Sequence, residues 1–342
     1  MPDPIRQATT RVVCFGELLL RLSAPKGRLL QHAAALDLCV GGAEANVAVS
    51  LACLGHDAAM VSRVPDNALG SAAVDALRSH GVDVAHVARA PGRMGLYFLT
   101  PGAVLRPSDI VYDRAGSSFA VTDPDTYDWE ALLRGADWLH VSGISPAVGD
   151  GPARALLAAM RAARELGVRV AFDGNYRASL WAARGSDGAA TLRALMAQAD
   201  LAFAGTRDFA LVLGRPELEQ AGRDEDAVAA AFAAFPLLSH IAHTGRRQHG
   251  VGQHELAAHL HTRSGSHTAG PYALHHIVDR IGTGDAFAAG ILDGLLRGAA
   301  PGETVAFGLA AAAMKHSIVG DFNPASRAQI EAVMEGALDV RR

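Results

Sequence analysis

The chain has 342 residues, of which 50% are hydrophobic and 19% charged, with a formal net charge of -4. This length and composition supply a sizeable apolar core for one large domain or two small ones. No block of like charges indicates a nucleic-acid partner, and no apolar run of about 20 residues indicates a membrane span. Three cysteines without CxxC spacing suit a reducing compartment, and no secretory signal is evident, so we expect a cytoplasmic protein.

Short apolar runs alternate with longer segments of helical periodicity along the chain. The expected strands are 12–15, 58–64, 138–141, 169–172, 201–203 and 241–242, and the expected helices are 45–54, 71–80, 152–166 and 227–235. This alternation predicts an α/β fold with a mostly parallel central sheet flanked by helices on both faces. Ligands of such sheets bind beyond the carboxyl ends of the strands.

Two stretches interrupt this alternation, at about residues 18–40 and 92–115, where short apolar runs are separated by Pro and Gly. We expect them to form a small second sheet, a lid over the ligand-binding edge; the alternative is a pair of surface hairpins. A single domain then spans residues 1–330, and 331–342 form a helix end and tail.

A late motif, residues 278–287 (VDRIGTGDAF), carries the strongest chemical signal. Gly282 and Gly284 allow a sharp turn, and the apolar residues that follow recur at helical spacing. The free amides of such a helix start form an anion site. Asp285 in the first turn can reach a hydroxyl placed beside a bound phosphate, as phosphoryl transfer to an alcohol requires. The alternative is an ordinary turn into a helix.

An early motif, residues 41–55 (GGAEANVAVSLACLG), combines paired glycines with a helix that a final glycine ends. The glycines let the backbone approach a ligand closely. Asn46, in the first turns of this helix, can present its amide to sugar hydroxyls; the alternative is that Asn46 only caps the helix.

The two motifs, in this order and on an α/β pattern, resemble the hallmarks of the PfkB/ribokinase family of carbohydrate kinases. The resemblance covers roughly residues 12–323. It implies a ribokinase-like fold with a small β lid, ATP and Mg²⁺ as cofactors, and a homo-oligomer formed through the lid. The GxxxxGK[ST] motif of P-loop enzymes is absent from the sequence.

Residues 15–23, 95–98, 112–118 and 315–323 are similar to segments of the 2-keto-3-deoxygluconate kinases of that family. The resemblance implies that the sugar acid is bound by Gly42, Ala43, Asn46, Tyr97, Tyr112, Arg114, Arg177, Asp285 and Asp321. Arginine suits this ligand because its planar fork meets a carboxylate with two hydrogen bonds. Alternatively, Arg114 or Arg177 is solvated, or is paired to Asp113 or Asp173.

The resemblance also implies the reaction: Asp285 takes the proton of the terminal hydroxyl as that oxygen attacks the γ-phosphorus of ATP, giving the 6-phosphate. Gly282, Thr283 and Gly284 form the anion hole. The expected ATP contacts are Asn175, Arg177, Thr244, Gly245, Gly282, Thr283 and Gly284.

The metal ligands follow less directly from the sequence. Residues 205–208 (GTRD) stand where many family members carry Asn-x-x-Glu, so Asp208 is a candidate Mg²⁺ ligand. Loop carbonyls near Asp279 and Ile281 are a candidate site for a monovalent cation such as K⁺. Two alternative functions remain: a kinase for a neutral sugar such as fructose or for another keto-acid, and a sugar-sensing protein without catalysis.

Overall fold

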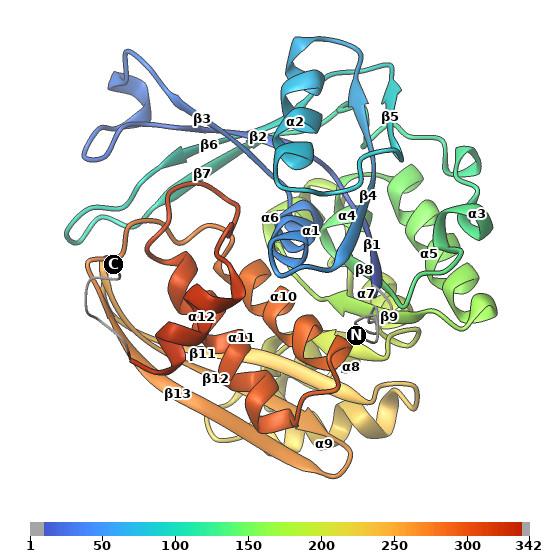
Figure 1. The fold of residues 1–342 in the computed structure, drawn as a ribbon, viewed down its shortest axis with the longest axis vertical. Helices are drawn as coiled ribbons and strands as arrows, with labels where there is room; N and C mark the ends of the chain where they lie inside the picture. The colour runs from blue at the N-terminus through green and yellow to red at the C-terminus, as the bar shows by residue number, and fades with distance from the viewer. Residues whose placement is uncertain (1–9, 337–342) are drawn as a thin grey trace, which may run out of the picture.

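The computed structural model describes residues 10–336, whose strands form two sheets (Figure 1). The large sheet has nine strands in the order β13-β12-β11-β10-β9-β8-β1-β4-β5. Its strands are β1 (Arg11–Phe15), β4 (Asp57–Pro65), β5 (Val87–Ala90), β8 (Trp138–Ser142), β9 (Arg169–Asp173), β10 (Leu201–Phe203), β11 (His240–Gly250), β12 (Gln253–Thr262) and β13 (Gly265–His275). The seven neighbouring strands β5, β4, β1, β8, β9, β10 and β11 pair in parallel. The last two strands of the sheet are antiparallel: β12 pairs with β11, and β13 pairs with β12.

Helices cover both faces of this sheet. They are α1 (Ala43–Cys53), α2 (Ala68–Ser79), α3 (Trp129–Leu133), α4 (Ile144–Val148), α5 (Asp150–Leu166), α6 (Ala178–Ala183), α7 (Ala189–Met196), α8 (Thr206–Leu213), α9 (Asp224–Ala234), α10 (Thr283–Leu296), α11 (Pro301–Lys315) and α12 (Arg327–Met334). Side chains of β1 alternate between two cores: Val12 and Cys14 pack with α1 and α10, whereas Val13 and Phe15 pack with α5. Burial on both faces explains why the parallel strands are continuous apolar runs.

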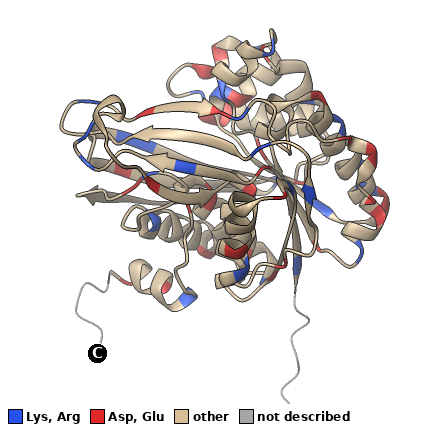
Figure 2. Ribbon diagram, turned by 90° about the horizontal axis from the view of Figure 1, so that it is seen from above, with Lys and Arg blue, Asp and Glu red and all other residues tan. Residues whose placement is uncertain are grey.

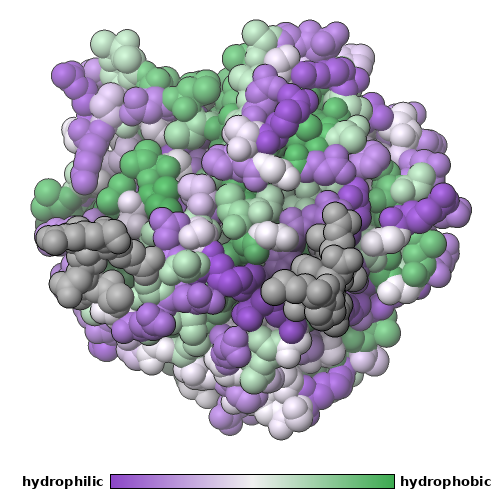
Figure 3. All heavy atoms as spheres, in the orientation of Figure 1, coloured by the Kyte–Doolittle hydropathy of each residue, from purple (hydrophilic) through white to green (hydrophobic). Residues whose placement is uncertain are grey.

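The second sheet is the lid, with strands β2 (Leu19–Ser23), β3 (Asp37–Gly41), β6 (Gly95–Thr100) and β7 (Asp109–Asp113) in the order β3-β2-β6-β7. It extends to the upper left in Figure 1. In the space-filling view a notch separates the lid from the region of α2 (Figure 3). The predicted fold class, a mostly parallel sheet flanked by helices with a small β lid, is confirmed.

The sequence pattern missed the end of the large sheet. Only 241–242 was expected as a strand there, but β11 continues to Gly250 and is followed by the long strands β12 and β13. Beyond Ala242 the residues of β11 are polar or glycine and mostly exposed, so no apolar period marks the strand. At the C-terminal end, α12 runs across residue 330, and 337–342 lie outside the described residues.

Charges of both signs are interspersed over the ribbon (Figure 2). No helix within residues 10–336 is long and apolar enough to cross a membrane.

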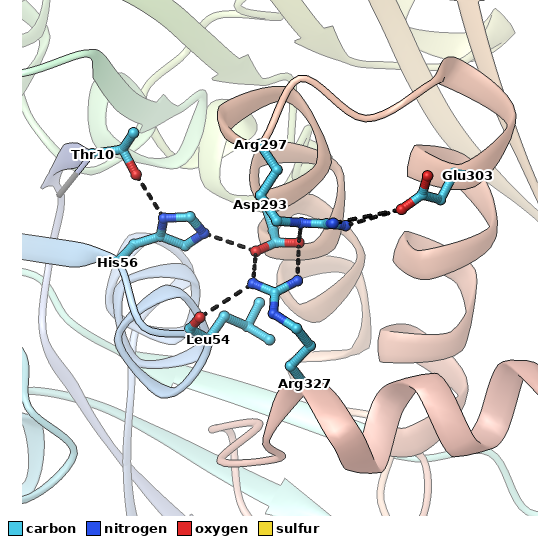
Figure 4. A network of polar contacts seen from close by, with 7 residues as sticks. All are labelled: Thr10, Leu54, His56, Asp293, Arg297, Glu303 and Arg327. Carbon is cyan, nitrogen blue, oxygen red and sulfur yellow. Dashed lines mark hydrogen bonds and ion pairs between the residues drawn. The ribbon is translucent and has the colours of Figure 1, made fainter. Parts of the chain in front are cut away.

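One buried ion cluster holds three segments together around Asp293 of α10 (Figure 4). The fully buried Asp293 carboxylate accepts hydrogen bonds from His56 Nε2 at 2.8 Å, Arg297 Nε at 3.0 Å and Arg327 Nη1 at 2.9 Å. Arg327 also donates to the Leu54 carbonyl at the end of α1. The cluster therefore joins α1, α10 and α12.

We expect Asp293→Asn to lower the free energy of unfolding by about 3 kcal/mol, because Arg327 loses its ion-pair partner and Arg297 keeps only the exposed Glu303, 3.5 Å away. Burial alone would raise the pKa of Asp293, but the bonds from His56 and Arg327 hold it well below its usual range. The cluster's contribution is therefore complete above about pH 4 and is lost as the pH falls through the folded pKa. Urea unfolding measures both effects. Asp75→Asn, which breaks the exposed pair with Arg78, is the control and should change stability by less than about 0.5 kcal/mol.

Candidate active site

A cavity of about 870 Å³ lies where the lid meets the carboxyl ends of the parallel strands. Its walls come from the start of α1, the lid strands, the segment after β9 and the start of α10. Among the predicted site residues, the cavity is lined by Gly42, Ala43, Asn46, Tyr97, Tyr112, Arg114, Asn175, Arg177, Asp208, Gly282, Thr283, Gly284, Asp285 and Asp321. Segments as far apart in the sequence as Gly42 and Asp321 thus meet at one edge of the sheet, where parallel sheets bind their ligands.

Thr244 and Gly245 are the exceptions among the predicted residues. Both lie on β11, paired with Ala258 and Ala257 of β12, and neither lines the cavity. Their assignment to ATP therefore stays a prediction from the family resemblance.

The start of α10 has the geometry of an anion site. Gly282 is the N-cap residue and has φ of +79°, and a Cβ at this position would lie 2.0 Å from the Asp321 carbonyl oxygen. Only glycine fits there without moving the backbone. The first intrahelical hydrogen bond of α10 runs from the Ala286 amide to the Gly282 carbonyl. The amides from Gly282 to Asp285 therefore have no acceptor within the helix and are available to an anion in the cavity.

Gly284 corrects part of the prediction. It lies inside α10 without a positive φ, so it does not make the turn. A Cβ at this position would have no neighbour within 4 Å. The absent side chain instead leaves open space at the cavity wall beside the helix amides.

Asp285 lines the cavity and is held by Asn46, whose Nδ2 donates to Asp285 Oδ2 at 2.6 Å. Burial raises the pKa of Asp285 to about 6; the bond from Asn46 opposes this effect and the charge of Asp321 adds to it. Gly42, not Asn46, is the N-cap of α1, which excludes the capping alternative. Asn46 Oδ1 is buried without a partner among the described residues, so it can accept a hydrogen bond from a ligand hydroxyl.

Arg114 has a partner that the sequence analysis did not anticipate. Its Nε donates to Glu17 Oε2 at 2.8 Å, its Nη2 also contacts that carboxylate, and Ser117 Oγ donates to the other oxygen. The expected alternative, Asp113, pairs with Arg93 at 2.6 Å. Glu17 takes one edge of the guanidinium, whereas Nη1 forms no hydrogen bond within residues 10–336. The only sequence signal for Glu17 was an acid inside an apolar run.

Arg177 forms no ion pair within the described residues; its Nη1 donates to the neighbouring Tyr176 carbonyl at 3.2 Å. Asp173, the alternative partner predicted for Arg177, also lines the cavity. Burial raises the pKa of Asp173 to about 8; the charge of Asp285 adds to this shift, and that of Arg177 opposes it. Asp173 Oδ1 also accepts from the amide of Asn175, whose φ is +39°.

Two further acids complete the polar wall. Asp208 Oδ2 accepts from the Gly205 amide at 2.9 Å, and burial raises the pKa of Asp208. Asp321 accepts from Tyr97 Oη at 2.5 Å and lies 3.2 Å from Arg21 Nε. Within residues 10–336, no three His, Cys, Asp or Glu side chains are grouped to chelate a metal. A divalent metal here would therefore need ligand phosphates and water for most of its coordination.

The lidded parallel sheet, the anion site at α10 and the acid in its first turn define a ribokinase-like α/β kinase. The chain belongs to the PfkB family of carbohydrate kinases: the family model described as pfkB family carbohydrate kinase matches residues 9–326.

The chain is 31% identical to a 2-dehydro-3-deoxygalactonokinase of Haloferax volcanii, over 96% of this chain and 98% of that protein. A 2-dehydro-3-deoxygluconokinase of Bacillus subtilis is 27% identical over 91% of both chains. Among solved structures, a 2-dehydro-3-deoxygluconokinase of Thermotoga maritima matches with a TM-score of 0.90 and 36% identity, covering 96% of this chain and 99% of that one. A fructokinase of Xylella fastidiosa with bound ATP, 20% identical, shares the fold with a TM-score of 0.80 and covers 96% of this chain and 99% of that chain.

Proposed function

We propose that the protein transfers the γ-phosphoryl group of ATP to the terminal hydroxyl of 2-keto-3-deoxy-D-gluconate, giving the 6-phosphate. The observation that carries this proposal is the carboxylate of Asp285, which lines the cavity from the first turn of α10. Three of the relatives named above are kinases of dehydro-deoxy sugar acids, and their names support a substrate with a carboxylate.

Asp285 acts as the general base. Its Oδ1 has no hydrogen-bond partner within residues 10–336, so it can accept the hydroxyl proton while Asn46 holds Oδ2. The hydroxyl oxygen forms the new bond to the γ-phosphorus, and the bond from that phosphorus to the oxygen of ADP breaks. The amides of Gly282, Thr283 and Gly284 stabilise the negative charge on the transferring group.

Mg²⁺ neutralises the negative charge of the ATP phosphates when it is bound. The donor set suits such a weakly held ion, because Asp208 offers its second carboxylate oxygen at the cavity wall and no complete protein cage exists among the described residues. Asn175 and Arg177, which follow β9, lie on the same wall and contact the nucleotide.

The carboxylate of the sugar acid is bound between the lid and the main sheet. Arg114 reaches the cavity from the lid, with its guanidinium oriented by Glu17, and Arg177 reaches it from the main sheet. Tyr112 lies beside Arg114, with the guanidinium carbon 5.8 Å from the ring centre. This arrangement leaves Arg114 Nη1 for the ligand.

We expect Arg114→Lys to raise KM for the sugar acid about 30-fold, because Lys keeps the charge but loses the fork that meets a carboxylate. An ADP-release assay over a panel of sugar acids and neutral sugars measures both this effect and the substrate class. Fructose is the internal reference, since any general damage to the lid affects both substrates. Arg93→Lys, on a lid arginine that does not line the cavity, is the matched control. An equal loss for both substrates would contradict carboxylate recognition, and faster turnover of fructose by the unmodified protein would favour a neutral-sugar kinase.

The same panel distinguishes gluconate-derived from galactonate-derived acids, which differ at C4. The Haloferax relative makes the second class a specific alternative. A higher kcat/KM for 2-keto-3-deoxygalactonate would move the assignment to that epimer without changing the roles of Asp285 and Arg114.

A further inference from the structure

One buried cation has no part in the reaction described above. Lys315, the last residue of α11, has no exposed surface, and it is one of only two lysines in the sequence. Its Nζ donates to the Ile318 carbonyl at 2.8 Å. Its Cε lies 3.4 Å from where a Cβ of Gly282 would be, so the side chain passes directly beneath the anion-hole turn.

Acids surround this ammonium group. Burial lowers the pKa of Lys315, and Arg21 lowers it further, whereas the charges of Asp279, Asp321 and Asp285 raise it. A buried ammonium persists in a protein when such charges compensate its lost hydration. Three carboxylates and two cations therefore lie close together next to the cavity, and removing Lys315 increases the excess of negative charge in this group.

The same acids hold the anion-hole loop. Asp279 Oδ1 accepts from the Ile281 amide at 3.0 Å, and its Oδ2 accepts from the Gly320 amide at 3.1 Å and from Arg21 Nη2 at 2.7 Å. The amides of Val278 and Asp279 in turn donate to the His316 carbonyl. Lys315 thus lies where the loop before α10 and the segment after α11 are bound to each other.

This is also the place where the sequence suggested K⁺, near Asp279 and Ile281. The residues present do not fit that ion. A carbonyl that would serve it, that of Ile318, already accepts from Lys315, and a second cation would have to share the same acids with an ammonium and a guanidinium. The structure therefore disagrees with a bound monovalent metal.

We infer that Lys315 is a built-in substitute for a monovalent cation, which fixes the anion-hole loop and makes the kinase independent of K⁺. This inference rests on the proposed function of the cavity. Lys315 does not line the cavity, so it is a positioning residue that acts through the loop.

Assays in choline chloride and in KCl test the inference. The unmodified protein should have the same kcat in both salts, within about twofold. Lys315→Ala should lower kcat about 10²-fold in choline chloride, because the loop amides lose their position. K⁺, NH₄⁺ or methylammonium should restore much of this loss by entering the vacated space. Lys315→Met should lose as much activity without recovery, since its apolar chain fills that space.

Lys26→Met, on the other lysine, which is exposed on the lid, is the matched control and should match the unmodified protein in both salts. A kcat of the unmodified protein that rises tenfold or more with K⁺ (a change of about 1.4 kcal/mol) would overturn the inference, as would a Lys315→Met variant with full activity. If the unmodified protein phosphorylates no sugar or sugar acid, the proposed function fails instead. Thermal melting then tests the cation site separately: K⁺ should stabilise Lys315→Ala but not the unmodified protein, and an equal response overturns the inference.

Discussion

Asp285→Asn is expected to lower kcat by about 10²- to 10⁴-fold, because the amide cannot accept the proton of the attacking hydroxyl. The substitution keeps the shape of the side chain, and its amide oxygen still accepts from Asn46 Nδ2, so the melting temperature should change little. Steady-state kinetics with saturating ATP and sugar acid, together with thermal melting, measures the two effects. Asp113→Asn, on a lid acid outside the cavity, is the control for the loss of a charge near the site.

The pH profile gives an independent reading of the same carboxyl. Since burial raises the pKa of Asp285 to about 6, kcat/KM of the unmodified protein should fall below about pH 6 as the base becomes protonated. The residual activity of Asp285→Asn should not show this fall at acidic pH, the acidic limb of the profile. A variant with the unmodified rate, or with the same acidic limb, would show that another group is the base.

Gly282→Ala is expected to lower kcat by about 10²- to 10³-fold and to destabilise the fold by a few kcal/mol. The methyl group would lie 2.0 Å from the Asp321 carbonyl oxygen at a φ of +79°, so the turn must move and carry the helix amides with it. Melting temperature and steady-state kinetics with varied ATP measure the two losses.

Gly284→Ala, two residues further on, distinguishes the effect of moving the turn from the effect of filling space in the cavity. Its methyl group meets no atom of the described chain, and alanine favours the helix by about 1 kcal/mol, so the protein should be at least as stable as the unmodified one. The methyl should still raise KM for ATP, because it occupies open space at the cavity wall. If both variants lost stability equally, the conclusion that Gly282 makes the turn and Gly284 does not would be wrong.

The sequence predicted the elements of this site better than their contacts. The spacing of glycines, an acid and apolar residues was sufficient to place α10 and its anion site, because helix starts have local signals. The bond from Asn46 to Asp285 joins residues 239 positions apart, and the clamp of Glu17 on Arg114 joins residues 97 apart. Such pairs depend on how the lid is placed over the sheet, which no local pattern encodes.

Burial explains the remaining differences. No pattern in the sequence marked Lys315 as buried, but the three acids around it compensate its charge in the interior. Conversely, β11 was undetected beyond Ala242 because its outer part is polar and exposed. Composition indicates burial for apolar runs, whereas it says little about a charge that is neutralised by distant partners.

The ion cluster at Asp293 has a consequence for the reacting end of the same helix. Asp285 and Asp293 are eight residues apart on α10, about 12 Å along its axis, with Asp285 in the first turn and Asp293 in the last. Arg327 of α12 binds the Asp293 end of the helix. Loss of this ion pair would let α10 shift, and the shift would move the proton acceptor at the other end of the helix. The position of Asp285 in the active site therefore depends on Arg327 of α12, a residue far from Asp285 in the sequence.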